Sequence, residues 1–180
     1  MPFIAKMLCA AGVVLSLCSQ PAAAATRSFF YPLGAAGVAS GAQGGSSGIL
    51  LPPTGNPAFQ VNFGLPVDYQ ANGAVNVVLY LVTAGFPCNA RIVPTSLRRT
   101  RLGSVQVDGL SGVNGGTPLR SFQSLAVVRK LITLQAGTGL AGQRAGDVLD
   151  LQVTRQADDA TDTCGTNVFV EAVEIQYPVP

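Results

Sequence analysis

The chain carries no histidine among its 180 residues. Ser-His-Asp and Cys-His nucleophilic devices and histidine-containing zinc sites are therefore excluded, and acid–base chemistry would have to use Asp, Glu, Lys or Tyr. Glu171 and Glu174 are three residues apart on a predicted strand and would lie on opposite faces. The glycine-rich runs lack the Lys-Ser/Thr pair and the helix of a phosphate-binding loop. The sequence predicts a protein that is not an enzyme.

The densest group of candidate ligands is an acidic loop that contains Asp158, Asp159 and Asp162. Three carboxylates on one loop supply the hard oxygen ligands that Ca²⁺ prefers. Asp is also common in turns, where its side chain accepts backbone N–H hydrogen bonds, and Asp162 could pair with Arg155. We favour this structural interpretation and keep a calcium site as the alternative. No other cofactor is expected.

A second charged group consists of Arg98, Arg99 and Arg101. These side chains could bind an acidic glycan or a lipid head group, but a solvated loop is the more common setting for them. Cleavage of an N-terminal leader that contains Lys6 would leave ten basic residues and nine acidic ones, a net charge of +1. A nearly neutral chain lacks the basic surface of a nucleic-acid-binding protein, so no nucleic-acid partner is expected.

Residues 1–25 have the organisation of a cleavable secretory signal peptide. Lys6 precedes an apolar run that ends at Leu17, and small residues lead to a predicted cleavage point after Ala25. This run is too short to span a bilayer comfortably, and no other segment is better suited. An uncleaved anchor and a lipoprotein acylated at Cys18 are alternatives, the second disfavoured because Leu17 replaces a small residue. We expect a secreted or periplasmic protein without a membrane span.

Cleavage after Ala25 would remove Cys9 and Cys18 and leave Cys88 and Cys164. An even pair of cysteines in an oxidising compartment most simply forms one disulfide. Free thiols or a bridge between two chains are the alternatives. The pair is not a Cys-x-x-Cys unit, so a redox-active site is not expected.

Short alternating apolar runs and frequent turns predict an all-β domain. A segment over 33–48 is rich in Gly, Ala and Ser, and we assign 26–55 to a first strand followed by this arm, and 56–180 to a β-sandwich. The ambiguous segment 121–134 fits a strand better than a helix. The other expected strands cover 27–31, 59–65, 75–82, 89–93, a short stretch around 105–107, 148–155 and 167–177.

The predicted strand over 75–82 is apolar on both faces. One face fills the core, and Val78, Tyr80 and Val82 on the other face require a second cover. The Gly-rich arm or a neighbouring subunit could supply it, since monomers seldom leave a large apolar patch exposed. These three residues are the predicted oligomer interface.

An alternating strand ends at Pro66 and is followed by Asp68-Tyr69, and Gly146-Asp147 precedes a strand that ends at Arg155. Asp158-Asp159, Asp162-Thr163 and a closing strand to Tyr177 complete the order. Over 56–177 this order resembles the jelly-roll modules of phage virion and tail proteins and of uncharacterised bacterial proteins. The resemblance implies an antiparallel β-sandwich of about eight strands, often assembled as a trimer. Those modules usually lack a signal peptide and a disulfide, and commonly carry Trp in the strand where this chain has Tyr80, so the viral context is not carried over.

Three functions remain as hypotheses. The first is an exported, non-enzymatic structural or assembly protein, a disulfide-containing jelly roll that forms a homotrimer. The second is a secreted module that binds carbohydrate or another cell-surface ligand, although the chain has no Trp and few other aromatic residues to form a sugar-binding platform. The third is a fimbrial-type subunit that is completed by a donated strand.

Overall fold

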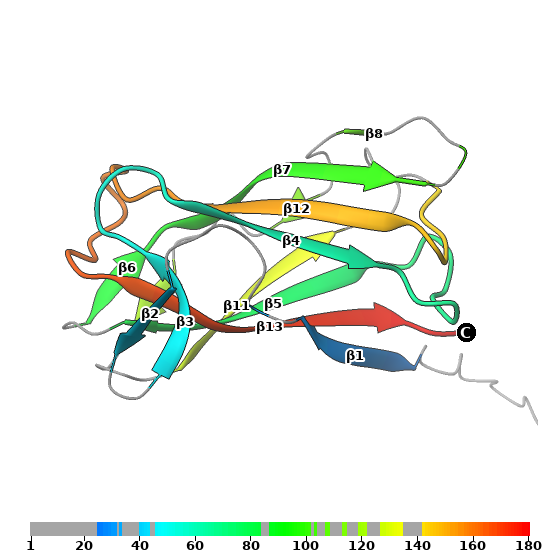
Figure 1. Cartoon of the computed structure of the whole chain (residues 1–180), viewed down its shortest axis with the longest axis horizontal. Helices are drawn as coiled ribbons and strands as arrows, with labels where there is room; N and C mark the ends of the chain where they lie inside the picture. Colours follow the sequence, from blue (N-terminus) through cyan, green and yellow to red (C-terminus); the bar gives the residue numbers. More distant parts are fainter. Residues whose placement is uncertain are drawn as a thin grey trace, which may run out of the picture.

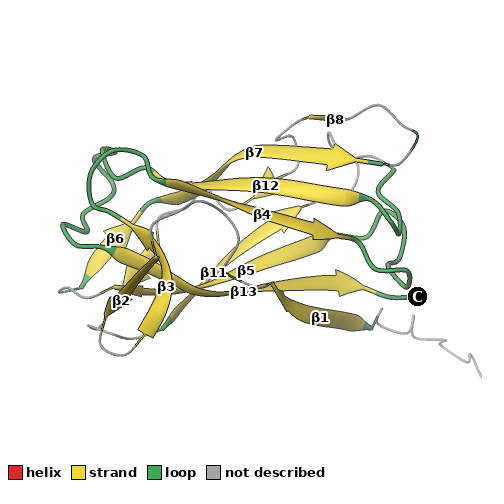
Figure 2. Cartoon of the chain, viewed as in Figure 1, coloured by secondary structure: helices red, strands yellow, loops and turns green. Residues whose placement is uncertain are grey.

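The computed structural model describes residues 25–31, 33, 40–43, 46–83, 87–101, 103, 107–108, 113–114, 119–121, 127–134 and 142–180. Residues 1–24 of the predicted signal peptide and residues 34–39 and 44–45 of the Gly-rich arm lie outside this described part. Every regular element among the described residues is a strand (Figure 2), so none of them forms a membrane-spanning helix. The strands are β1 (Thr26–Tyr31), β2 (Ser40–Gln43), β3 (Ser46–Leu51), β4 (Ala58–Gly64), β5 (Val75–Thr83), β6 (Cys88–Ala90), β7 (Ile92–Thr100), β8 (Val107–Asp108), β9 (Val113–Asn114), β10 (Leu119–Ser121), β11 (Val128–Leu134), β12 (Val148–Arg155) and β13 (Val168–Pro178).

Two antiparallel sheets pack face to face (Figure 1). Sheet A has the order β2-β3-β13-β5-β11-β9, and β1 also pairs with β13. Sheet B has the order β4-β12-β7-β8, and β6 and β10 form a separate two-stranded ribbon. In Figure 1, β4, β12 and β7 form the upper layer, and β13, β5 and β11 form the lower layer. The predicted antiparallel β-sandwich is confirmed.

The strand order also identifies the type of sandwich. Eight strands, numbered here from first to eighth in chain order, make up the two sheets of the sandwich: β3, β4, β5, β7, β8, β11, β12 and β13. Sheet A holds the first, eighth, third and sixth of them side by side, and sheet B holds the second, seventh, fourth and fifth. This is the order of a jelly roll, in which two Greek keys fold over one another. The fold expected from the resemblance is therefore confirmed by topology.

Alternating side chains on β4 and β12 form the sheet B side of the core. Phe63 lies opposite Leu149, and Val61 lies opposite Leu151, all four buried. The intervening Gln60 and the other polar residues of β4 point to solvent, as a period of two requires. Burying a large apolar side chain stabilises a fold by about 1.5–3 kcal/mol, so this register is strongly specified. The sheet A side is formed by Val75, Val77, Leu79, Leu81, Ile132, Leu134, Val173, Ile175 and Tyr177.

The segment after Cys88 differs from the prediction. In place of one short strand over 89–93 and a long connection, the chain forms β6, breaks at Arg91 and continues as β7 to Thr100. Only Ile92, Val93 and Leu97 of β7 are buried. The pairing of β7 with β12 shifts register between Gln152 and Val153, where Thr95 is the extra residue on β7, so the buried positions of β7 do not follow a simple alternation. The segment 121–134 contains β11, which confirms the preference for a strand.

The N-terminal strands belong to the sandwich itself. All of β1 pairs with the C-terminal half of β13, and Ile49–Leu51 of β3 pair with its beginning. Strands β1 and β3, which the prediction assigned to the N-terminal strand and arm, therefore extend sheet A. Gly48 has a specific role here, because a Cβ at this position would lie 2.3 Å from the carbonyl oxygen of Val170. A glycine is required for β3 to approach β13 this closely.

Candidate functional site

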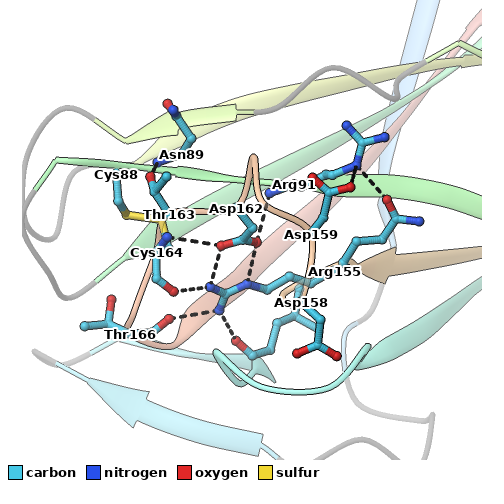
Figure 3. Close-up of polar contacts among 12 residues, drawn as sticks. Cys88, Asn89, Arg91, Arg155, Asp158, Asp159, Asp162, Thr163, Cys164 and Thr166 are labelled. Atoms are coloured by element: carbon cyan, nitrogen blue, oxygen red, sulfur yellow. Dashed lines mark hydrogen bonds and ion pairs between the residues drawn. A yellow bond between two sulfur atoms is a disulfide. The ribbon is translucent and has the colours of Figure 1, made fainter.

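A fully buried arginine stands at the end of β12. The side chain of Arg155 has no exposed surface, and all five of its N–H donors are used. Its Nε and Nη2 donate to the two carboxylate oxygens of Asp162, each at 3.0 Å. Nη1 donates to the carbonyls of Leu51 and Thr166 at 2.9 Å, and Nη2 also donates to that of Cys164 (Figure 3). A buried cation with this set of partners is a structural group.

The carboxylate of Asp162 is saturated in the same way. Beyond the two bonds from Arg155, its Oδ2 accepts from the backbone N–H of Arg91 at 3.0 Å and its Oδ1 accepts from that of Cys164 at 3.1 Å. Four N–H donors therefore surround the two oxygens of one buried carboxylate. The predicted ion pair between Asp162 and Arg155 is confirmed, and the pair joins the acidic loop to the start of β7.

The other two acidic residues of the loop have separate partners. Asp159 accepts hydrogen bonds from the backbone N–H and the hydroxyl of Thr161, which lower the pKa of its carboxyl, and lies 3.3 Å from Nε of Arg91. Asp158 is exposed and accepts from the backbone N–H of Gly55 at 3.2 Å. No three metal-ligating side chains converge anywhere in the described part of the chain. These contacts favour the structural interpretation of Asp158, Asp159 and Asp162 over the calcium site.

The predicted disulfide lies beside this network. Cys88 at the start of β6 is bonded to Cys164 in the loop before β13, with their Cα atoms 5.0 Å apart. The neighbouring residues pair as well, because the backbone N–H of Asn89 donates to Oγ1 of Thr163 and the N–H of Thr163 donates to the carbonyl of Asn89. The covalent bond, the hydrogen bonds and Arg155 all fix one loop to one end of the sandwich (Figure 3).

A second buried ion pair lies at the opposite end of β12. Asp147 is buried, and Arg101 contacts both of its oxygens, with Nε 2.5 Å from Oδ1 and Nη2 2.6 Å from Oδ2. Nη2 of Arg101 also donates to the carbonyl of Gly142. Burial acts to raise the pKa of Asp147, but the hydrogen bonds from Arg101 and from the backbone N–H of Arg144 outweigh it, and the pKa is lowered.

The three arginines proposed as an anion site do not present one common surface. Arg98 and Arg99 are successive residues of β7 and lie opposite Asp150 and Leu149, respectively. Successive residues of a strand point to opposite faces. Arg101 is bound to its own buried carboxylate. The arrangement uses Arg101 for structure rather than for an acidic ligand.

We expect Asp147→Asn to destabilise the protein at neutral pH and to lose this effect in acid. Because the pKa of Asp147 is lowered in the folded protein, its carboxylate stabilises the fold above the unfolded pKa, about 3.9. That contribution is lost as the pH falls through the folded value. Denaturant titrations of both proteins between neutral pH and about pH 2 measure the difference, which should shrink below about pH 4. A difference that is the same at every pH would contradict the assignment.

The remaining buried polar cluster is structural as well. The hydroxyl of Tyr69 contacts the carbonyl of Gly73 and lies 3.0 Å from Oε1 of Gln143. Burial is the main factor that raises the pKa of Tyr69 to about 12, with a smaller contribution from Asp147. Tyr69 is therefore a neutral hydrogen-bonding group at physiological pH. The cluster joins the turn after β4 to the turn before β12.

The outward side of sheet A, which faces away from sheet B, has a different character, and we call it the outer face. One row of directly paired residues crosses it from Phe30 on β1 through Glu174 on β13 and Val78 on β5 to Leu131 on β11. The residues at the two ends of this row are large and apolar: Phe30 is 66% exposed and Leu131 is 51% exposed. These two exposed side chains are separated by Glu174 and the buried Val78.

Tyr80 organises the polar groups of the outer face. Its hydroxyl donates to Oε2 of Glu174 at 2.7 Å, and this hydrogen bond is the main reason that the pKa of Glu174 is lowered. The guanidinium carbon of Arg129 lies 5.8 Å from the centre of the Tyr80 ring. The centres of the Phe30 and Tyr80 rings are 6.2 Å apart. An acid, a base and two aromatic rings thus lie together on solvent-facing strands.

The predicted interface residues Val78, Tyr80 and Val82 all lie on β5. Val78 and Val82 are buried within the single chain, at 0% and 3% exposure, so of the two expected sources of cover the chain itself, rather than a neighbouring subunit, accounts for them. Tyr80 is half-buried. The exposed apolar residues of the cross-strand row are Phe30 and Leu131, neither of which was a predicted interface residue. The sequence feature that could have identified them is an apolar residue at a position of β1 or β11 that points away from the core.

Neither comparison with known proteins identifies the chain: no family model matches it, and no curated protein matches it.

Proposed function

We propose that this chain is an exported, non-enzymatic structural protein, a jelly roll that associates with copies of itself through the outer face of sheet A. The observation that supports this proposal most directly is the cross-strand row with Phe30 and Leu131 at its exposed positions. Burial of such side chains is a main source of association energy between subunits. The buried polar networks at both ends of the sandwich support a stable scaffold rather than a reaction centre.

Export is part of the same proposal. The leader over 1–25 carries the charge, apolar run and small residues of a signal peptide. The bond between Cys88 and Cys164 fits an oxidising compartment, where structural disulfides persist. A secreted or periplasmic location follows from both features.

A carbohydrate ligand is the weaker alternative for the outer face. Sugar hydroxyls would need polar groups with free hydrogen-bonding capacity, but the oxygens of Glu174 already accept from Tyr80 and from Nε2 of Gln176. The chain has no Trp to form a flat platform. The fimbrial alternative is also weaker, because β1 already pairs with β13 in the same chain. The apolar row therefore favours a second copy as the partner.

We expect the mature exported protein to be oligomeric and Leu131→Lys to shift it to monomer. A lysine at an interface would be left as a buried charge without a partner, which strongly disfavours association. Light scattering on the purified protein, after its intact mass has shown cleavage after Ala25, measures the effect.

Val67→Lys is the matched control, because Val67 is 96% exposed in the turn between β4 and β5 and belongs to no strand of the outer face. This variant should keep the wild-type mass. A monomeric wild-type protein would refute the proposal, and an oligomeric Leu131→Lys variant would exclude the outer face as the interface.

A further inference from the structure

The peptide bond at the predicted cleavage point, between Ala25 and Thr26, lies at the beginning of β1. Its carbonyl oxygen, on Ala25, accepts a hydrogen bond from the backbone N–H of Val179 at 2.9 Å. On the other side of the bond, Thr26 is paired with Pro178 of β13. The bond that export would cut is therefore part of sheet A in the folded full-length chain.

The direction of the Ala25 carbonyl determines whether a peptidase can use it. Its oxygen points toward β13, because it accepts from the chain that continues that strand. A peptidase must bind the same oxygen with its own hydrogen-bond donors, which stabilise the negative charge that forms when the carbonyl carbon is attacked. An oxygen held between two strands cannot be surrounded by those donors until the strands separate.

The strand that donates to Ala25 is fixed from both sides. The side chain of Val179 is buried and belongs to the hydrophobic core. The carbonyl of Pro178 accepts from the backbone N–H of Gln70 at 2.9 Å, which ties this end of β13 to the turn after β4. Exposing the Ala25 carbonyl therefore requires the displacement of β1.

Several contacts oppose that displacement. All six residues of β1 pair with the C-terminal half of β13 (Figure 1). The centre of the Phe29 ring lies 6.5 Å from that of Phe63 and 6.2 Å from that of Tyr177, and Arg27 forms an ion pair with Asp68. Local opening of β1 breaks these contacts together, so the open form is a minor population of the folded chain.

We infer that the leader is removed only while β1 is unpaired, so that the fold imposes an order in which hydrolysis comes first and the pairing of β1 with β13 comes second. The inference rests on the proposed export. In the hydrolysis, the bond between the carbonyl carbon of Ala25 and the nitrogen of Thr26 breaks. The oxygen of one water molecule joins that carbon to form a carboxylate, and both protons of the water end on the nitrogen, which becomes the α-ammonium group of the mature chain. A precursor that folds first keeps its leader.

The test compares the rates at which a purified leader peptidase, in detergent, cuts folded and unfolded full-length precursors. The folded precursor is the wild type with its disulfide formed. The unfolded one carries Ile175→Asp, which places a carboxylate at a fully buried position of β13. Cleavage of the folded precursor should be at least about tenfold slower, because it follows the population of the open form. Intact mass should show that the product of the unfolded precursor begins at Thr26.

A second pair of precursors separates the pairing of β1 from the rest of the fold. A flexible insert of about six Gly and Ser residues between Ala25 and Thr26 moves the bond after Ala25 out of the sheet and leaves β1 in place. The folded precursor with this insert should be cut as fast as the same precursor carrying Ile175→Asp. Thermal unfolding checks that the insert leaves the sandwich intact and that Ile175→Asp abolishes it.

The outcomes distinguish the inference from the proposal on which it rests. Slow cleavage of the folded wild type, with rapid cleavage of the other three precursors, supports the order. Equal rates for the folded wild type and its unfolded counterpart overturn it. Slow cleavage of the folded precursor with the insert overturns it as well, because protection then does not come from the pairing of β1. Failure to cut the unfolded precursors after Ala25 refutes the proposed export itself.

Discussion

Asp162→Ala is expected to lower the free energy of unfolding by about 3–5 kcal/mol, because removing one partner of a buried ion pair leaves the other charge uncompensated. Arg155 would keep its carbonyl partners but lose the only carboxylate bound to it. The backbone N–H groups of Arg91 and Cys164 would lose their acceptor at the same time. The effect should therefore far exceed that of a lost hydrogen bond in an exposed turn, which is about 1 kcal/mol.

Denaturant unfolding with the disulfide intact measures this change. Asp158→Ala is the matched control, since Asp158 is an exposed acid in the same loop with one bond to Gly55, and it should change stability by less than about 1 kcal/mol. Calcium and a chelator should each leave the unfolding curves of the wild type and of both variants unchanged. Equal effects of the two substitutions would contradict the role of Asp162, and stabilisation by calcium would make the loop a metal site.

Replacing Cys88 and Cys164 together by serine is expected to lower stability by about 4 kcal/mol. The bond closes a loop between residues 76 positions apart, and in the chain-entropy model a closed loop of this length restricts the unfolded chain by that amount. The double variant is the comparison to make, because a single replacement would leave one reactive thiol.

Unfolding of the wild type with and without reductant, beside the double variant, provides the measurement. The reduced wild type and the double variant should agree with each other and unfold at a lower denaturant concentration than the oxidised wild type. Peptide mapping without reductant should recover the Cys88–Cys164 pair. An oxidised wild type no more stable than the double variant would show that the bond does not stabilise the fold.

The strands that were predicted correctly are those whose pattern is local. The alternation in β4 ends at Pro66, and β12 alternates over its whole length between two polar turns, so both were located within one residue. A period of two with one buried face leaves little freedom in register. The disulfide could also be predicted, because only two cysteines remain after the leader.

The strands that were missed depend on distant partners. β3 contains Gly48 and only three apolar residues, and it is a strand because β13 offers it a free edge. β7 contains Pro94 and several polar residues, and its pairing with β12 passes through a bulge. Neither segment contains this information, because it lies in partner residues about fifty or more positions away in the sequence.

The same limit applied to the candidate site. The pair of Arg155 and Asp162 could be suggested from their separation of seven residues, but the burial of Arg155 depends on the carbonyl of Leu51, which is 104 residues away. Hydrophobicity identified both faces of β5 as apolar but could not show that Val78 and Val82 are covered within the chain. The row that joins Phe30 to Leu131 exists only after β1, β13, β5 and β11 have paired.

The position of β13 determines when this molecule can fold. The last strand of the chain lies in the interior of sheet A, where it pairs with β5 on one side and with β1 and β3 on the other. Strands β1 and β3 therefore cannot pair with β13 until the ribosome has synthesised the final residues, and sheet A cannot be completed before nearly the whole chain is present. Contacts of such large sequence separation also form slowly. A polypeptide built in this order cannot complete sheet A during synthesis, which would suit the export that we propose.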